Sequence, residues 1–274
     1  MLNKLLKYEF KSTARIFCPI YGLLLAFALL SHLSVSGLME MQESFLNTLS
    51  VIAIMGSVVV IISTRGIPGV VIVQRFFKNL TGDEGYLMHT LPVSSHQLIT
   101  AKLISSVVWE ITSALMVMLS VFLLFMRPEV LRQIPQFLGD VGQILAAAVG
   151  EVGLLRVVGI VLSAIVFMLL SAATATLLIF ASISIGHIIS THRVMGSFAA
   201  YIGLMMVMQA VTALLGGSGI ALGEACFDGV PILAPQAAGM VLGILWVSIL
   251  LQACFAGALY FITQYVLSHR LNLE

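Results

Sequence analysis

Long apolar runs alternate with short polar stretches along the whole chain, and this pattern predicts a helical membrane protein. A membrane helix needs about 20 residues, at roughly 1.5 Å each, to cross about 30 Å of hydrocarbon. Apolar runs that meet this length lie at residues 16–33, 45–73, 103–125, 157–185, 196–215 and 239–266. We therefore expect an all-α, polytopic membrane protein with six transmembrane helices, in a single transmembrane domain covering residues 1–274.

The first 15 residues, MLNKLLKYEFKSTAR, contain neither proline nor glycine. Their leucines share one helical face and their lysines share another, which predicts an amphipathic helix lying on an anionic membrane leaflet. The alternative is the charged start of a signal peptide. The apolar run that follows argues against it, because that run exceeds the usual length of about 7–15 residues and no cleavage pattern follows it.

The polar segments between the spans differ in charge. With six crossings, both termini lie on the same side of the membrane, and nine basic residues fall on that side against three on the other. The nine are Lys4, Lys7, Lys11, Arg15, Arg75, Lys78, Lys102, Arg193 and Arg270, and the three are Arg127, Arg132 and Arg156. Basic residues collect in cytoplasmic loops. We therefore expect a multi-pass protein of the cell (plasma) membrane with cytoplasmic N and C termini.

Composition agrees with the membrane class, since 60% of the residues are apolar and only 9% are charged. A typical soluble domain has about 25% charged residues. The net charge of +1 gives no sign of a nucleic-acid partner. The sequence has no P-loop motif, and its histidines and cysteines lack metal-ligand or disulfide spacing. We expect no catalytic residue, no metal site and no cofactor on this chain.

The longest polar stretch between two apolar runs is the cytoplasmic loop at residues 74–102, QRFFKNLTGDEGYLMHTLPVSSHQLITAK. We expect its acids, Asp83 and Glu84, to begin a short helix, because the positive end of a helix dipole favours acidic side chains. Tyr86, Leu87, Met88 and Leu91 then form an apolar surface that needs lipid headgroups or a docked protein to cover it. The alternative is a solvated loop without a partner. Pro92 ends this helix, and Ser94 or Ser95 caps the next one.

Two charges fall within the apolar runs on either side of this loop. Arg65 and Glu110 lie at similar depths in consecutive antiparallel spans, so we expect an intramembrane ion pair or a shared polar cavity. Ionisable residues inside a membrane span are costly and usually functional. The alternative is that Arg65 extends its side chain to the interface and forms no pair.

The stretch at 74–102 closely resembles the cytoplasmic loop of ABC-2-type permeases, the membrane subunits of bacterial ABC transporters. It is most similar to the small separate permeases of Gram-positive bacteria. MLNKLLKYEFKSTAR resembles the N-terminal elbow helix of this family, and the closing RLNLE resembles the usual end of its members. The resemblance implies an ABC-2-type (type V exporter-like) transmembrane domain in which residues 1–15 form the elbow helix.

The family also implies partners. A cytoplasmic ABC ATPase dimer, encoded separately, would supply ATP and Mg²⁺, and a second permease subunit, identical or related, would face this one in the bilayer. The resemblance makes the loop an ATPase-coupling segment whose residues are Asp83, Glu84, Gly85, Tyr86, Leu87, Leu91 and Pro92. The expected function is an exporter-type permease. The alternatives are the membrane subunit of an ABC-type sensor or immunity complex, and a stand-alone secondary transporter.

Overall fold

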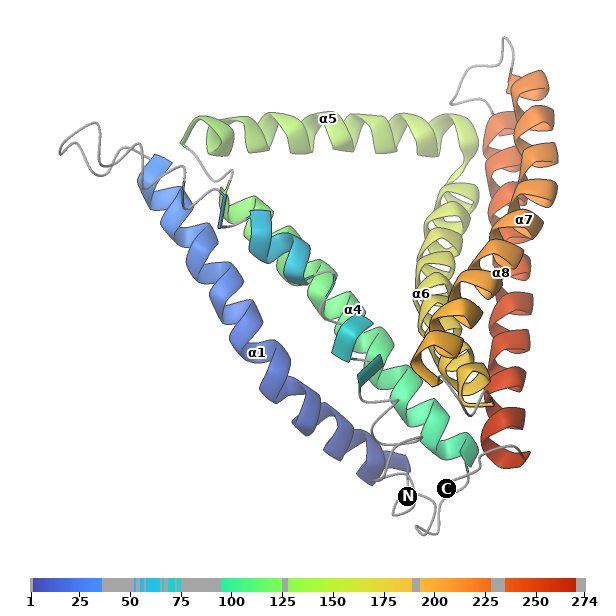
Figure 1. The fold of residues 1–274 in the computed structure, drawn as a ribbon. Helices are drawn as coiled ribbons and strands as arrows, with labels where there is room; N and C mark the ends of the chain where they lie inside the picture. Colours follow the sequence, from blue (N-terminus) through green and yellow to red (C-terminus); the bar gives the residue numbers. More distant parts are fainter. Residues whose placement is uncertain are drawn as a thin grey trace. The chain divides into compact units, whose positions relative to one another are not determined.

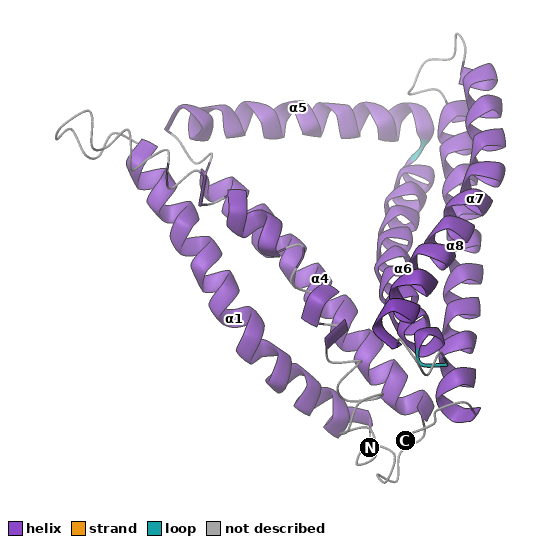
Figure 2. Cartoon of the chain, in the orientation of Figure 1, coloured by secondary structure: helices purple, strands orange, loops and turns teal. Residues whose placement is uncertain are grey.

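All regular structure in the described part of the chain is helical. The computed structural model describes residues 2–35, 95–124, 128–188, 193–227 and 235–269, together with scattered positions between 52 and 74. The helices with described bounds are α1 (Leu2–Val35), α4 (Ser95–Leu124), α5 (Pro128–Val152), α6 (Leu154–Gly186), α7 (Arg193–Phe227) and α8 (Pro235–His269), shown in Figures 1 and 2. The predicted all-α class is confirmed for these residues.

Five of these helices are long and apolar enough to cross a membrane: α1, α4, α6, α7 and α8. They contain the apolar runs predicted at 16–33, 157–185, 196–215 and 239–266, and the part of the run at 103–125 that is described, residues 103–124. The predicted span at 45–73 is described only in part, as a shorter apolar helix at Val58–Val71. The chain is therefore a polytopic helical membrane protein.

The first helix differs from the expectation of two separate elements. Residues 2–35 form one continuous helix, without a break between Arg15 and Ile16, and Pro19 lies inside it. Neither proline nor glycine occurs before Pro19, so the basic first half continues directly into the apolar second half. The elbow helix at 1–15 is thus the first part of α1, and its position on a leaflet remains a prediction.

The helices extend beyond three of the predicted apolar runs. The helix α4 begins at Ser95, where Ser94 or Ser95 was expected to cap it, so that Lys102 lies inside the helix. Between the predicted spans at 103–125 and 157–185, residues 128–152 form the 25-residue helix α5. The helix α7 continues past residue 215, the predicted end of its span, to Phe227 through several glycines. A helix satisfies its own backbone hydrogen bonds, which favours its extension in or near a membrane.

The chain forms two compact units, one of Met1–Ile72 with Thr100–Gly139 and the other of Val73–Ile99 with Asp140–Glu274. In the first unit, α1 and α4 lie side by side and run in the same direction (Figure 1). Their side-chain contacts keep a nearly constant separation in sequence, 93 residues for Glu9 with Lys102 and 92 for Tyr21 with Ser113. This constant offset defines a parallel helix pair.

In the second unit, α6, α7 and α8 pack side by side (Figure 1). The single residue between α5 and α6 is Gly153, whose φ of 94° lies in the left-handed region that favours glycine. At the other end of α6, a Cβ on Gly186 would overlap the backbone and hydroxyl group of Ser197 in α7. Glycine at this position therefore allows α6 and α7 to approach closely where the chain turns between them.

Candidate functional site

The predicted coupling residues lie outside the described part of the chain. These residues are Asp83, Glu84, Gly85, Tyr86, Leu87, Leu91 and Pro92. Arg65 also lies outside it, whereas Glu110 is described as a partly buried residue of α4. The Arg65–Glu110 ion pair therefore stays a prediction. The described end of the predicted loop, residues 95–102, is the first two turns of α4.

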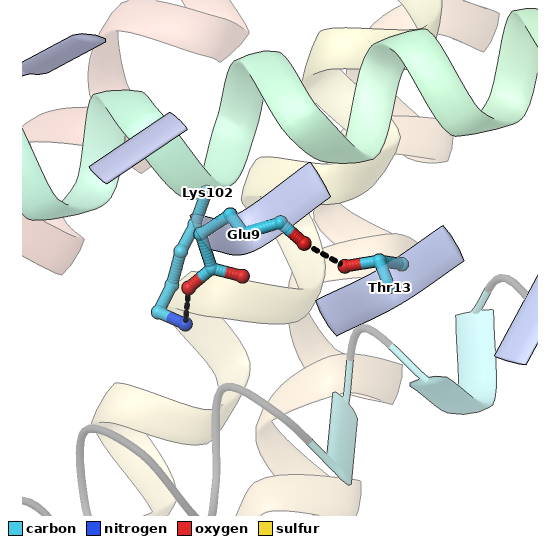
Figure 3. A network of polar contacts seen from close by, with 3 residues as sticks. All are labelled: Glu9, Thr13 and Lys102. Atoms are coloured by element: carbon cyan, nitrogen blue, oxygen red, sulfur yellow. Dashed lines mark hydrogen bonds and ion pairs between the residues drawn. The ribbon is translucent and has the colours of Figure 1, made fainter. Parts of the chain in front are cut away.

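A buried ion pair fixes this end of the loop to α1. The Lys102 ammonium lies 2.8 Å from Glu9 Oε1, and the two side chains are only 5% and 11% exposed (Figure 3). Thr13, one turn further along α1, donates its hydroxyl hydrogen to the carbonyl oxygen of Glu9 over 2.6 Å. The lysine of the predicted loop is thus a buried structural cation.

The burial of both charges makes each one dependent on the other. Removing one partner of a buried pair leaves an uncompensated charge away from water, at a cost of about 3–5 kcal/mol. Replacing both by apolar groups of similar volume can be nearly neutral. The main effect of the pair is therefore to fix which residues of α1 and α4 meet, and its contribution to net stability is small.

Beyond the ion pair, aromatic rings fill the contact between α1 and α4. The indole of Trp109 stacks on Phe17 with ring centroids 4.8 Å apart, and Phe10 lies 6.3 Å from the same indole. Phe17 and Tyr21 are buried and pack with Val71. Rings of this size hold the two helix backbones apart while keeping their side chains in contact, with stacking worth about 0.5–1.5 kcal/mol per pair.

A hydrogen bond completes this contact about three turns of α1 beyond Phe10. The hydroxyl groups of Tyr21 and Ser113 are 2.7 Å apart, and Ser113 is buried. The indole nitrogen of Trp109 is buried and has no hydrogen-bond partner among the described residues. The contacts from Glu9 to Tyr21 extend over roughly 18 Å of α1 at about 1.5 Å per residue.

Within the second unit, the first turn of α4 makes its own contact with α8. The imidazole of His96 meets the ring of Tyr260 edge-on, with centroids 5.5 Å apart. Leu98 and Ile99 on the following turn are buried. The described end of the predicted loop is therefore held by side-chain contacts at both His96 and Lys102.

Sequence reasoning missed the Glu9–Lys102 pair. The sequence pattern places Lys102 among the nine basic residues of the cytoplasmic side and does not single out Glu9. One signal was present, because Glu9 is the only acidic residue before Glu40 and lies among lysines on a helix. The sequence contains no indication of which of the later basic residues pairs with it.

The described residues hold no group of three or more histidine, cysteine, aspartate or glutamate side chains that could bind a metal ion. Cys18 and Cys254 are free thiols on exposed faces of their helices. The arrangement between α1 and α4 is therefore a mechanical connection between two helices, made of one ion pair, stacked rings and a hydroxyl pair.

Comparisons with protein-family models, curated proteins and solved structures find no match to this chain.

Proposed function

We propose that the chain is the membrane-spanning permease subunit of an ATP-binding cassette transporter, working as an exporter. A separate cytoplasmic ATPase dimer binds ATP and Mg²⁺, and a second permease subunit, identical or related, completes the transmembrane pathway. The observation that carries the proposal is the stretch at 74–102, a polar loop with a Tyr-Leu-Met segment between two apolar runs. Its resemblance to the coupling loop of ABC-2-type permeases supplies the role.

The parallel arrangement of α1 and α4 supports the proposed topology. Two consecutive membrane helices that run in the same direction need a return crossing between them. The apolar run at 45–73, of which Val58–Val71 is partly described as helix, is long enough to provide it. This crossing raises the count to six spans and puts the loop at 74–102 on the same side as the N terminus.

The basic residues then support a cytoplasmic position for that side. Lys4, Lys7 and Lys11 lie exposed on the first turns of α1, and cytoplasmic segments are enriched in lysine and arginine. A cytoplasmic loop at 74–102 can reach a soluble ATPase. In this arrangement the chain is a plasma-membrane protein with both termini in the cytoplasm.

The coupling mechanism follows from the connections of the loop. ATP binding closes the ATPase dimer, and the movement enters the permease through Asp83–Leu91, residues of the predicted short helix. This helix is joined to α4, whose second turn is fixed to α1 by Lys102 and Glu9. A tilt of α4 therefore moves α1 with it, because separating the two helices would expose two unpaired buried charges.

Co-purification tests the proposal directly. The chain, extracted from its native membrane in mild detergent, is expected to bring down a P-loop ATPase identified by mass spectrometry. The double variant Tyr86→Ala/Leu91→Ala is expected to lose that ATPase, because it removes the apolar surface proposed to dock into it. Leu154→Ala/Leu155→Ala is the matched control, since it truncates two exposed apolar residues at the start of α6, on the other side of the membrane in the proposed topology.

The outcomes separate the candidate functions. Retention of the ATPase by the control and its loss from the loop variant would support both the permease class and its coupling site. An ATPase that stays bound to the loop variant would refute the coupling site alone. If no ATPase appears with the wild-type chain, the permease proposal fails and a stand-alone carrier becomes the better account.

A further inference from the structure

Helix α5 lies between two helices, α4 and α6, that are long and apolar enough to cross a membrane. It runs from Pro128 to Val152, three residues after α4 ends and one residue before α6 begins. Unlike α4 and α6, it is not among the described helices apolar enough to span a membrane. In the proposed six-span topology, on which this inference rests, α5 does not cross, so that the end of α4 and the start of α6 lie at the same membrane surface.

Apolar and polar residues separate onto opposite faces of α5. Its apolar side chains recur every three or four residues and form one stripe along the helix, at about 100° per residue. The stripe consists of Ile134, Phe137, Leu138, Val141, Ile144, Leu145, Ala148 and Val152. Its polar side chains lie on the opposite face and flanks, namely Arg132, Gln133, Gln136, Asp140, Gln143 and Glu151.

The stripe is uncovered in the described structure. Phe137, Leu138 and Ile144 are each more than 60% exposed, and Leu145 is 51% exposed. None of the α5 side chains from residue 132 onward is fully buried. Burying a large apolar side chain is worth about 1.5–3 kcal/mol, so an apolar stripe of this length needs a covering medium.

The position of α5 in the chain points to lipid as the medium that covers the stripe. Each end of α5 is joined to an apolar helix proposed to cross the membrane, so both ends of the stripe are close to the bilayer. At roughly 1.5 Å per residue, α5 is about 37 Å long and can only lie along that surface if its two ends stay there. We propose that α5 is an interfacial helix, with its apolar stripe inserted between the lipid headgroups and acyl chains.

The charge of α5 defines the kind of lipid contact. Between residues 128 and 152 there are three acids, Glu129, Asp140 and Glu151, and one base, Arg132. Many interfacial helices depend on basic residues and anionic lipids. The net negative charge of α5 excludes attraction to anionic headgroups as the driving force. Insertion therefore depends on the buried apolar area and is independent of anionic lipid.

Spin labelling of the full-length chain tests this placement. In a background in which the three native cysteines are replaced by serine, single cysteines are introduced at Phe137 and Leu145 on the stripe. Gln136→Cys and Gln143→Cys on the polar face are the matched controls. Each labelled protein is reconstituted into phosphatidylcholine vesicles, with and without phosphatidylglycerol. Accessibility is then compared between oxygen, which concentrates in the bilayer, and a polar nickel chelate.

The stripe positions are expected to favour oxygen and the polar positions to favour nickel, in both vesicle compositions. Equal nickel access at all four sites would overturn the proposal, since the helix would then stand away from the membrane. Shielding of the stripe from both reagents would also overturn it, because protein would then cover the stripe. A pattern that appears only with phosphatidylglycerol would refute the apolar basis of insertion.

A second measurement avoids the cysteine background. In a background in which Trp109 and Trp246 are replaced by phenylalanine, Phe137→Trp places the single tryptophan on the stripe, and Gln136→Trp places it on the polar face. Brominated acyl chains are expected to quench the first fluorophore more strongly than the second, relative to the same variants in unbrominated lipid. Equal quenching of the two would contradict the proposal. Neither experiment depends on ATPase binding, and either can fail while the permease proposal stands.

Discussion

At the scale of single residues, the ion pair between Lys102 and Glu9 is the contact whose loss is expected to cost the most stability. Both side chains are almost fully buried, so neither charge is hydrated when the other is removed. The Tyr21–Ser113 hydroxyl pair is also buried, but both of its members are neutral. The two pairs therefore differ in energetic consequence, although both join α1 to α4.

Lys102→Met is expected to destabilise the protein by about 3–5 kcal/mol, because it removes the ammonium group 2.8 Å from the nearly buried carboxylate of Glu9. Glu9→Leu/Lys102→Met is expected to recover most of this loss, since it removes both charges at similar volume. Unfolding in mixed detergent micelles, followed by circular dichroism, measures both. Lys11→Met is the control, because it makes the same substitution at an exposed lysine of α1, the helix that carries Glu9. A double variant no more stable than Lys102→Met would contradict the pairing.

The Tyr21–Ser113 pair should contribute much less. Hydrogen bonds between membrane helices average about 0.6 kcal/mol in double-mutant cycles. A cycle of Tyr21→Phe, Ser113→Ala and the double variant is expected to give a coupling energy near that size, measured by the same unfolding experiment. A coupling above about 2 kcal/mol would exceed the usual range for such bonds and show that the hydroxyl pair has a larger role.

At the scale of whole elements, five of the six predicted apolar runs fall in helices that are long and apolar enough to cross a membrane, because long apolar runs leave a helix few alternatives in lipid. The hydropathy pattern did not predict the helix at 128–152, which contains Pro135 and several glycines, nor the continuation of α7 through the glycines from Gly216 onward. In both places helix continued through residues that weaken it.

The candidate site was less predictable than the helices. Lys102 and Glu9 are 93 residues apart, and hydrophobic periodicity shows which face of a helix is apolar without showing which later helix meets it. The contact between Trp109 and Phe17 could not be predicted for the same reason, since nothing in the sequence distinguishes either residue from the other apolar residues of its helix. Only the parallel packing of α1 and α4 brings these four residues into pairs.

The contact between α6 and α7 allows a test of element packing. Gly186→Ala is expected to lower the melting temperature in detergent, because the new methyl group would overlap Ser197 and separate the two helices. Overpacking of this kind costs about 1–3 kcal/mol. Gly203→Ala in α7 is the control, since nothing lies within 4 Å of the Cβ position there. Equal melting temperatures for the two variants would show that the turn relaxes around the extra methyl group.

At the scale of the whole molecule, the direction of each helix determines the topology. The parallel course of α1 and α4 leads to the proposed six-span arrangement, with the N terminus and the loop at 74–102 on one side and α5 on the other. In this proposed arrangement α5 joins α4 to α6 on the side opposite the N terminus, so its residues can be used to test the topology.

Cysteine labelling in intact cells checks this topology. In a background without native cysteines, Asp140→Cys on the polar side of α5 is expected to react with a membrane-impermeant maleimide. Lys7→Cys near the start of α1 is expected to react only after the membrane is permeabilised. Labelling of both in intact cells would place them on the same side and would contradict the six-span arrangement.

The sequence distance between Glu9 and Lys102 also has a consequence during synthesis. The two residues are separated by 93 positions, and at about 5–20 residues per second a ribosome needs roughly 5–20 s to make that length of chain. For this time α1 exists without Lys102 and Trp109, which contact Glu9 and Phe17 in the complete fold. Chains stalled before Lys102 are therefore expected to be recognised by membrane quality-control proteases, and chains stalled after Ser113 to be spared.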